Sequence, residues 1–152
     1  MLLPVYLDLL AGAERALAVS FRMVATGHAA EADVFHLCNT LGEQCEQHVD
    51  AIAPFAQRFG SAGGGAPERV GVTALGAARS GPLGMLRDLQ DLYALASLVE
   101  STWTVVQQAG QAVRDAELLQ TVSAALKQTE LQLAWLRTHL KEAAAQALVA
   151  AS

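Results

Sequence analysis

Aromatic and basic residues are scarce in this chain of 152 residues. Aromatic side chains make up 5% of the sequence, whereas hydrophobic residues make up 53% and alanine is abundant. A β-sandwich or β-barrel would show alternating β-branched and aromatic residues, so this composition favours closely packed helices. Ten Lys and Arg stand against fifteen Asp and Glu, which gives a net charge of −5, and the basic residues are scattered singly. We therefore expect neither nucleic acid nor an anionic membrane surface as a partner, because both bind clustered positive charge.

Cysteine is also rare, with only Cys38 and Cys45 present. Seven residues of helix span about 10 Å, which exceeds the Cα separation of roughly 7 Å that a disulfide tolerates. We expect two buried thiols in a reducing compartment. The sequence has no apolar run of about 18 residues, the length that a membrane span requires. Its first residues lack the basic segment of a signal peptide. These features predict a cytoplasmic protein.

Four stretches carry apolar residues three and four apart, which is the spacing of one helix face. They predict helices over about 4–26, 31–59, 83–113 and 115–149. The Gly- and Pro-rich loop 60–82 is long enough to run the length of a bundle. We predict a single domain over 1–152, an all-α four-helix bundle with one long crossover between the second and third helices. An up-down-up-down bundle is the alternative. Pro54 predicts a kink or an early end in the second helix.

Polar residues interrupt two of the apolar stripes. Glu14 lies in the first stripe, and Cys45 and His48 lie three apart in the second, on one helix face. Two interpretations are open. These residues could be metal ligands, or Glu14 could pair with His48 or an Arg as a buried specificity element, because an unpaired buried carboxylate costs several kcal/mol. The remaining histidines, His28, His36 and His139, are expected to face solvent, with a helix-dipole role as the alternative for the last.

The pattern resembles the ferritin-like superfamily of four-helix bundles. In that family two helices each carry a Glu, and the other two each carry Glu-x-x-His. The matching residues here are Glu14, Cys45 with His48, Glu100, and Glu130 with Leu133. The midpoint between Glu14 and Cys45 falls inside the link 27–33, and Glu100 and Glu130 each lie fifteen residues from Asp115. Cys45 thus stands in place of one motif's Glu, and Leu133 in place of the other's His.

The resemblance implies a metal site in the bundle with five candidate ligands: Glu14, Cys45, His48, Glu100 and Glu130. Iron, manganese or zinc could bind there, and zinc suits a thiolate, imidazole and carboxylate set. Because the motif is incomplete, we predict a ferritin-like bundle without an intact di-iron site, acting as a non-catalytic assembly or interaction protein. The first alternative is a metal-binding or oxidative-stress protein that holds one or two ions inside the bundle. The second is a bundle that binds a small apolar ligand between its helices.

Self-association is the expected mode of partnership. Apolar residues that lie off the predicted stripes could supply a homodimer surface. These residues are Leu95, Leu98 and Leu131.

Overall fold

The computed structural model describes residues 1–60 and 73–150. Its elements are α1 (Leu3–Gly27), α2 (Ala32–Arg58), α3 (Gly81–Val113), α4 (Ala116–Ala145) and a closing π-helical turn, η1 (Gln146–Ala150). The predicted helices are therefore confirmed, with ends that shift by at most four residues. The predicted loop falls largely on 61–72, outside the described residues.

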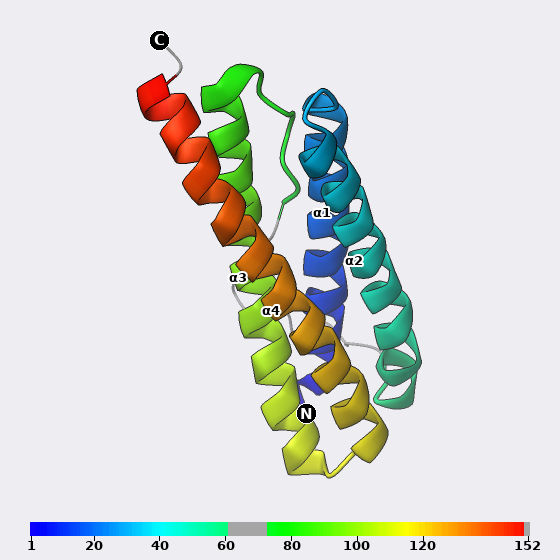
Figure 1. The fold of residues 1–152 in the computed structure, drawn as a ribbon. Helices are drawn as coiled ribbons and strands as arrows, with labels where there is room; N and C mark the ends of the chain where they lie inside the picture. Colours follow the sequence, from blue (N-terminus) through cyan, green and yellow to red (C-terminus); the bar gives the residue numbers. More distant parts are fainter. Residues whose placement is uncertain (61–72, 151–152) are drawn as a thin grey trace.

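The four helices form a bundle of two antiparallel hairpins, α1–α2 and α3–α4 (Figure 1). α2 ends near the chain's N-terminus, whereas α3 begins at the opposite end of the bundle (Figure 1). The connection therefore crosses the length of the bundle, which confirms the predicted topology and excludes the up-down-up-down alternative. Contacts are densest within each hairpin, substantial between α1 and α3, and sparse between α2 and α4.

The core lies on the helix faces that the apolar spacing predicted in α1 and α2. Each predicted stripe has seven residues and all are buried: Leu3, Leu7, Leu10, Glu14, Leu17, Phe21 and Val24 in α1, and Val34, Cys38, Leu41, Cys45, His48, Ile52 and Phe55 in α2. The buried face of α4 is rotated slightly from the predicted stripe, which is Leu119, Val122, Leu126, Thr129, Leu133, Leu136 and Leu140. Leu119, Leu126 and Leu140 are only half-buried, whereas Leu118, Ala125 and Gln132 are buried. The rotation brings a polar residue, Gln132, into the bundle interior.

The start of α4 is fixed by a side chain and by a neighbouring helix. The Asp115 carboxylate accepts a hydrogen bond from the Leu118 N–H (3.0 Å), which caps the helix. Arg58, at the end of α2, pairs with Asp115 at 2.6 Å and with Glu117 at 2.7 Å. α2 extends to Arg58 with Pro54 inside it, so the expectation of an early end at Pro54 is wrong.

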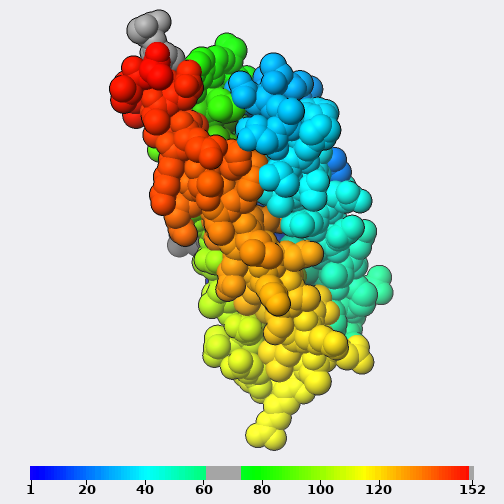
Figure 2. Space-filling model, in the orientation of Figure 1, coloured from blue at the N-terminus to red at the C-terminus, as the bar shows by residue number. Residues whose placement is uncertain are grey.

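α2 and α4 lie side by side on one face of the molecule, as the space-filling view shows (Figure 2). Residues 73–80 approach α1 on their way to α3, because the Leu75 N–H donates to the Ser20 hydroxyl at 3.1 Å. None of the described helices carries an apolar stretch long enough to cross a membrane.

Candidate functional site

Glu14 is the centre of a polar cluster inside the bundle. It lies mid-way along α1 and is 0% exposed. Its Oε1 atom accepts a hydrogen bond from the indole N–H of Trp103 on α3 at 2.8 Å. The Nδ1 atom of His48 on α2 lies 3.0 Å from the same oxygen. Both neighbours are buried, so the carboxylate is paired within the protein rather than by bulk water.

His48 extends this cluster to the fourth helix. Its Nε2 atom lies 2.6 Å from the Oε1 atom of Gln128 on α4. Each ring nitrogen therefore faces an oxygen acceptor, an arrangement that favours the doubly protonated imidazolium. Burial lowers the pKa of His48, but the hydrogen bonds to Glu14 and Gln128 and the charge of Glu14 outweigh it and raise the pKa above its ordinary value. Glu14 and His48 form a buried ion pair that is connected to all four helices.

Cys45 lies one helical turn before His48 and faces the same interior. The Nε2 atom of Gln132 lies 3.8 Å from its sulfur and also donates to the Gln44 side chain at 3.0 Å. Burial raises the pKa of the Cys45 thiol, and the nearby carboxylate of Glu14 raises it further. Burial likewise raises the pKa of Cys38, to about 12, with a contribution from Asp33. Both thiols are therefore protonated, and neither is an activated nucleophile.

The five predicted ligands do not come together as one site. Glu14, Cys45 and His48 converge, but Glu130 is exposed on α4 and Glu100 is only half-buried on α3. Both ring nitrogens of His48 face protein oxygens, so His48 would have to give up one of these contacts to bind an ion. Glu14 Oε2 and Gln132 Oε1 are the buried oxygens without a partner in the described residues. The geometry fits the ion-pair interpretation and does not fit a di-metal centre; binding of a single ion by Glu14, Cys45 and His48 stays a prediction.

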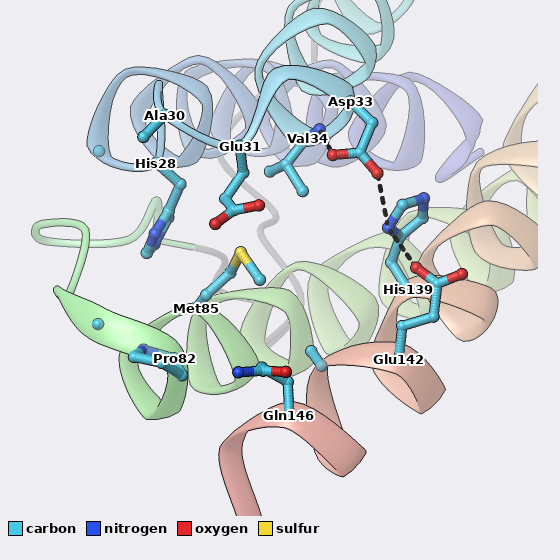
Figure 3. A pocket seen from close by; sticks show the side chains of 13 residues that line it. His28, Ala30, Glu31, Asp33, Val34, Pro82, Met85, His139, Glu142 and Gln146 are labelled. Carbon is cyan, nitrogen blue, oxygen red and sulfur yellow. Dashed lines mark hydrogen bonds and ion pairs between the residues drawn. The ribbon is translucent and has the colours of Figure 1, made fainter. Parts of the chain in front are cut away.

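A pocket of about 550 Å³ opens at the end of the bundle that contains the α1–α2 turn (Figure 3). Its walls come from the α1–α2 turn, the start of α2, the start of α3 and the last turns of α4. Val34 and Met85 give it an apolar side, and the Glu31 carboxylate points into it (Figure 3). Among the described residues, neither lysine nor arginine lines it. The pocket therefore combines apolar surface with negative charge.

Three metal-ligating side chains meet at one wall of this pocket. Asp33 from α2 and Glu142 from α4 approach His139 of α4 (Figure 3). The distance from His139 Nδ1 to Asp33 Oδ2 is 3.8 Å, and that to Glu142 Oε2 is 3.5 Å. Within the described residues, this is the one group of three or more His, Cys, Asp or Glu whose ligand atoms all lie within 4.8 Å of one another.

A second buried ion pair lies beside the pocket. Asp88 of α3 is 0% exposed and receives His28 Nε2 at 2.7 Å, together with the Arg79 backbone N–H at 2.9 Å and its guanidinium at 2.8 Å. The expectation that His28 faces solvent is therefore wrong, whereas His36 is exposed as expected. The His139 side chain is 13% exposed, so it is not a solvated residue either.

Sequence reasoning missed this end of the molecule, although one signal was present. His139 and Glu142 are spaced three apart, which places them on one helix face. Two other contacts between α2 and α4 show how Asp33 could have joined them. His48 meets Gln128 and Gln44 meets Gln132, so each step of four back along α2 matches four forward along α4. Continuing that register to the start of α2 places Asp33 opposite Ala143, next to Glu142 and one helical turn after His139.

Comparison with known proteins found no matching family model, no matching curated protein and no matching solved structure. The functional interpretation therefore depends on the geometry alone.

Proposed function

We propose that this chain is a non-catalytic binding protein, a four-helix bundle that receives a small ligand in the pocket at one end. The observation that carries the proposal is the pocket itself, about 550 Å³ in volume and lined from both hairpins. That volume is in the range of small-molecule sites, which are typically apolar with a few polar groups. The polar cluster around Glu14, in contrast, is internally paired and serves the fold.

The test fills the pocket without altering the core. Ala30 lines the pocket, whereas its exposed neighbour Ala29 on the same turn does not. We expect Ala30→Trp to abolish ligand binding and Ala29→Trp to leave it intact. The wild type and both variants are screened by thermal shift against a panel of organic acids, amines and nucleosides, with EDTA present to remove metal effects.

A ligand at about one hundred times its Kd stabilises a protein by about 2.7 kcal/mol, which raises the Tm by several degrees. A compound that does so for the wild type and Ala29→Trp, but not for Ala30→Trp, supports the proposal. If no compound in the panel distinguishes the two variants, the pocket is not a small-molecule site.

Self-association is a second candidate, and one observation favours it. Leu148 and Val149 of η1 are 66% and 84% exposed, and Leu83 at the start of α3, an element that η1 contacts, is 44% exposed. Of the three leucines considered from sequence, Leu131 is exposed and Leu95 and Leu98 are half-buried. Light scattering of a Leu148→Glu, Val149→Glu double variant and of Leu131→Glu would identify a dimer interface. A wild type that is monomeric at micromolar concentration would exclude this candidate.

The ferritin-like relationship remains a proposal, supported by the two hairpins joined by a crossover. We also propose a cytoplasmic location, where reduced thiols such as Cys38 and Cys45 are maintained. An ion inside the bundle, whether iron, manganese or zinc, is the alternative function. Metal analysis of the untagged wild type and Glu14→Gln tests that alternative, because a Glu14-dependent ion would be lost from the variant.

A further inference from the structure

We infer that Asp33, His139 and Glu142 form a binding site for a divalent transition-metal ion of the zinc class. The inference deepens the proposed function, because it names an ion as one ligand of the same pocket. Its first support is geometric. A tetrahedral ion with bonds of about 2.1 Å places its donors about 3.4 Å apart. The two distances measured from His139 Nδ1, 3.5 and 3.8 Å, are close to that value.

The second support is the charge balance of the group. Two carboxylates, Asp33 and Glu142, lie around one imidazole, and among the described ion pairs both contact only His139. Two negative charges close together disfavour each other unless a cation lies between them. A divalent ion would neutralise both, and a protonated His139 could neutralise only one. The imidazolium arrangement is therefore the rival interpretation that an experiment must exclude.

The third support is that two of the three donors are already oriented by other contacts, and the third lies on the same helix face as one of them. Asp33 Oδ1 accepts the Val34 backbone N–H at 2.9 Å, which leaves Oδ2 directed toward His139. The His139 ring packs on Trp135 with centroids 4.3 Å apart. Glu142 follows three residues later on the same face of α4. Donors held in this way need little reorganisation on binding, which favours affinity.

The donor set also indicates which ions fit. One imidazole nitrogen and two carboxylate oxygens suit Zn²⁺, Co²⁺, Mn²⁺ or Fe²⁺, whereas Mg²⁺ and Ca²⁺ prefer oxygen donors alone. Three protein donors leave a fourth position of a tetrahedral ion for water or another ligand. The three donors line the pocket (Figure 3), so we expect a ligand in the pocket to reach that position.

Calorimetric titration of the untagged apo-protein with Zn²⁺ and Co²⁺ tests the site. We expect one ion per chain with micromolar or tighter affinity, a visible absorption band typical of tetrahedral Co²⁺, and no response to Mg²⁺. His139→Ala, Asp33→Asn and Glu142→Gln should each weaken Zn²⁺ binding by roughly tenfold or more. Glu43→Gln is the matched control, because Glu43 is an exposed carboxylate of the same helix, ten residues from Asp33 and outside the group.

A local signal ties the ion to this wall of the pocket. Zn²⁺ should change the fluorescence of Trp135, which contacts His139, and the change should be absent in Trp135→Phe. The two carboxylate variants change exposed side chains, 63% and 67% accessible, and should keep the wild-type Tm without metal. Thus a misfolded His139→Ala protein would not leave the question open.

Two results would overturn the inference. One is a wild type that does not bind Zn²⁺, as the imidazolium arrangement predicts. The other is Zn²⁺ binding that survives in all three variants, which would place the ion elsewhere. Neither outcome touches the small-molecule screen, which is run with EDTA and depends on Ala30. Failure of the ion site and failure of the proposed function can therefore be told apart.

Discussion

At the scale of the residue, the buried carboxylate of Glu14 is the centre of the polar contacts in the core. Glu14 accepts hydrogen bonds from Trp103 and His48, and its negative charge offsets the positive charge of the buried His48 ring. We expect Glu14→Gln to lower the free energy of unfolding by about 1–3 kcal/mol, because the amide keeps the shape and loses the charge. Urea denaturation measures the change. Glu130→Gln, at an exposed residue, should differ from the wild type by less than about 0.5 kcal/mol. Equal stability of the Glu14 variant and the wild type would contradict the ion pair.

His48 makes this contribution dependent on pH. Its pKa in the folded protein lies above the value of about 6.5 that it has in the unfolded chain. The folded state therefore holds more protons between these two values, and the stability that the pair provides decreases as pH rises through the folded pKa. That stability is fully present below about pH 6.5.

A comparison of the wild type with His48→Gln isolates this effect. The advantage of the wild type in urea denaturation should be largest near pH 6 and should shrink as the pH rises from about 6.5 through the pKa of the folded state. NMR titration of the His48 ring gives that pKa independently. An advantage that grows with pH, or a ring pKa below about 6.5, would show that His48 is not the imidazolium partner of Glu14.

At the scale of the element, two glycines of α1 have opposite roles. A Cβ on Gly27 would overlap the Cβ of Ala78, in the segment that leads to α3, whereas a Cβ on Gly12 would have no atom within 4 Å. Gly27→Ala should therefore displace residues 73–80 and cost about 1–3 kcal/mol. Gly12→Ala should stabilise by up to about 1 kcal/mol, because alanine favours the helix. Thermal unfolding of both variants measures the difference. Stabilisation by both substitutions would mean that residues 73–80 do not pack on the end of α1.

The helices themselves were predictable, and so was the convergence of Glu14 with Cys45 and His48. Apolar spacing is a property of the sequence alone, and residues equidistant from a tight turn must lie at the same level. The buried face of α4 was less predictable. Gln132 is buried because it meets Gln44 and Cys45 of α2, a contact that no periodicity within α4 reveals.

At the scale of the whole molecule, the two hairpins contact each other through two interfaces, here called seams, which differ in how closely they pack. The seam between α1 and α3 has extensive contacts and joins Glu14 to Trp103. The seam between α2 and α4 is sparse, and side-chain pairs such as Gln44–Gln132 connect it. The proposed ion site lies at one end of this second seam. An ion bound there would link the hairpins where their packing is weakest.

The end of the molecule near the pocket was the least predictable part. The pocket depends on how far each helix extends and on where the chain before α3 lies. Both are set by contacts between residues far apart in the sequence, such as His28 and Asp88, sixty residues apart. No spacing rule within a single helix reports on such contacts, so His28 was expected in solvent.

Asp88 connects the crossover with both hairpins, so substituting it tests the topology. It joins His28 of the first hairpin to Arg79 of the crossover, and it is itself part of the second hairpin. Asp88→Ala would leave these donors without a buried acceptor, so we expect a loss of roughly 3 kcal/mol in urea denaturation. Asp91→Ala is the matched control. Asp91 pairs with the same Arg79 side chain at 42% exposure, and its loss should cost less than about 1 kcal/mol.

Hydrogen exchange would show where the Asp88 variant loosens. The amides of Leu75 and Arg79 donate to Ser20 and Asp88, so both should be protected in the wild type. In Asp88→Ala the Arg79 amide loses its acceptor, and exchange should accelerate across residues 73–80 before it accelerates in the helices. If the two aspartate variants lose the same stability and exchange alike, the crossover is not anchored by Asp88. Residues 73–80 would then be held by the hydrogen bond between Leu75 and Ser20 and by the packing of Leu75 and Ala78.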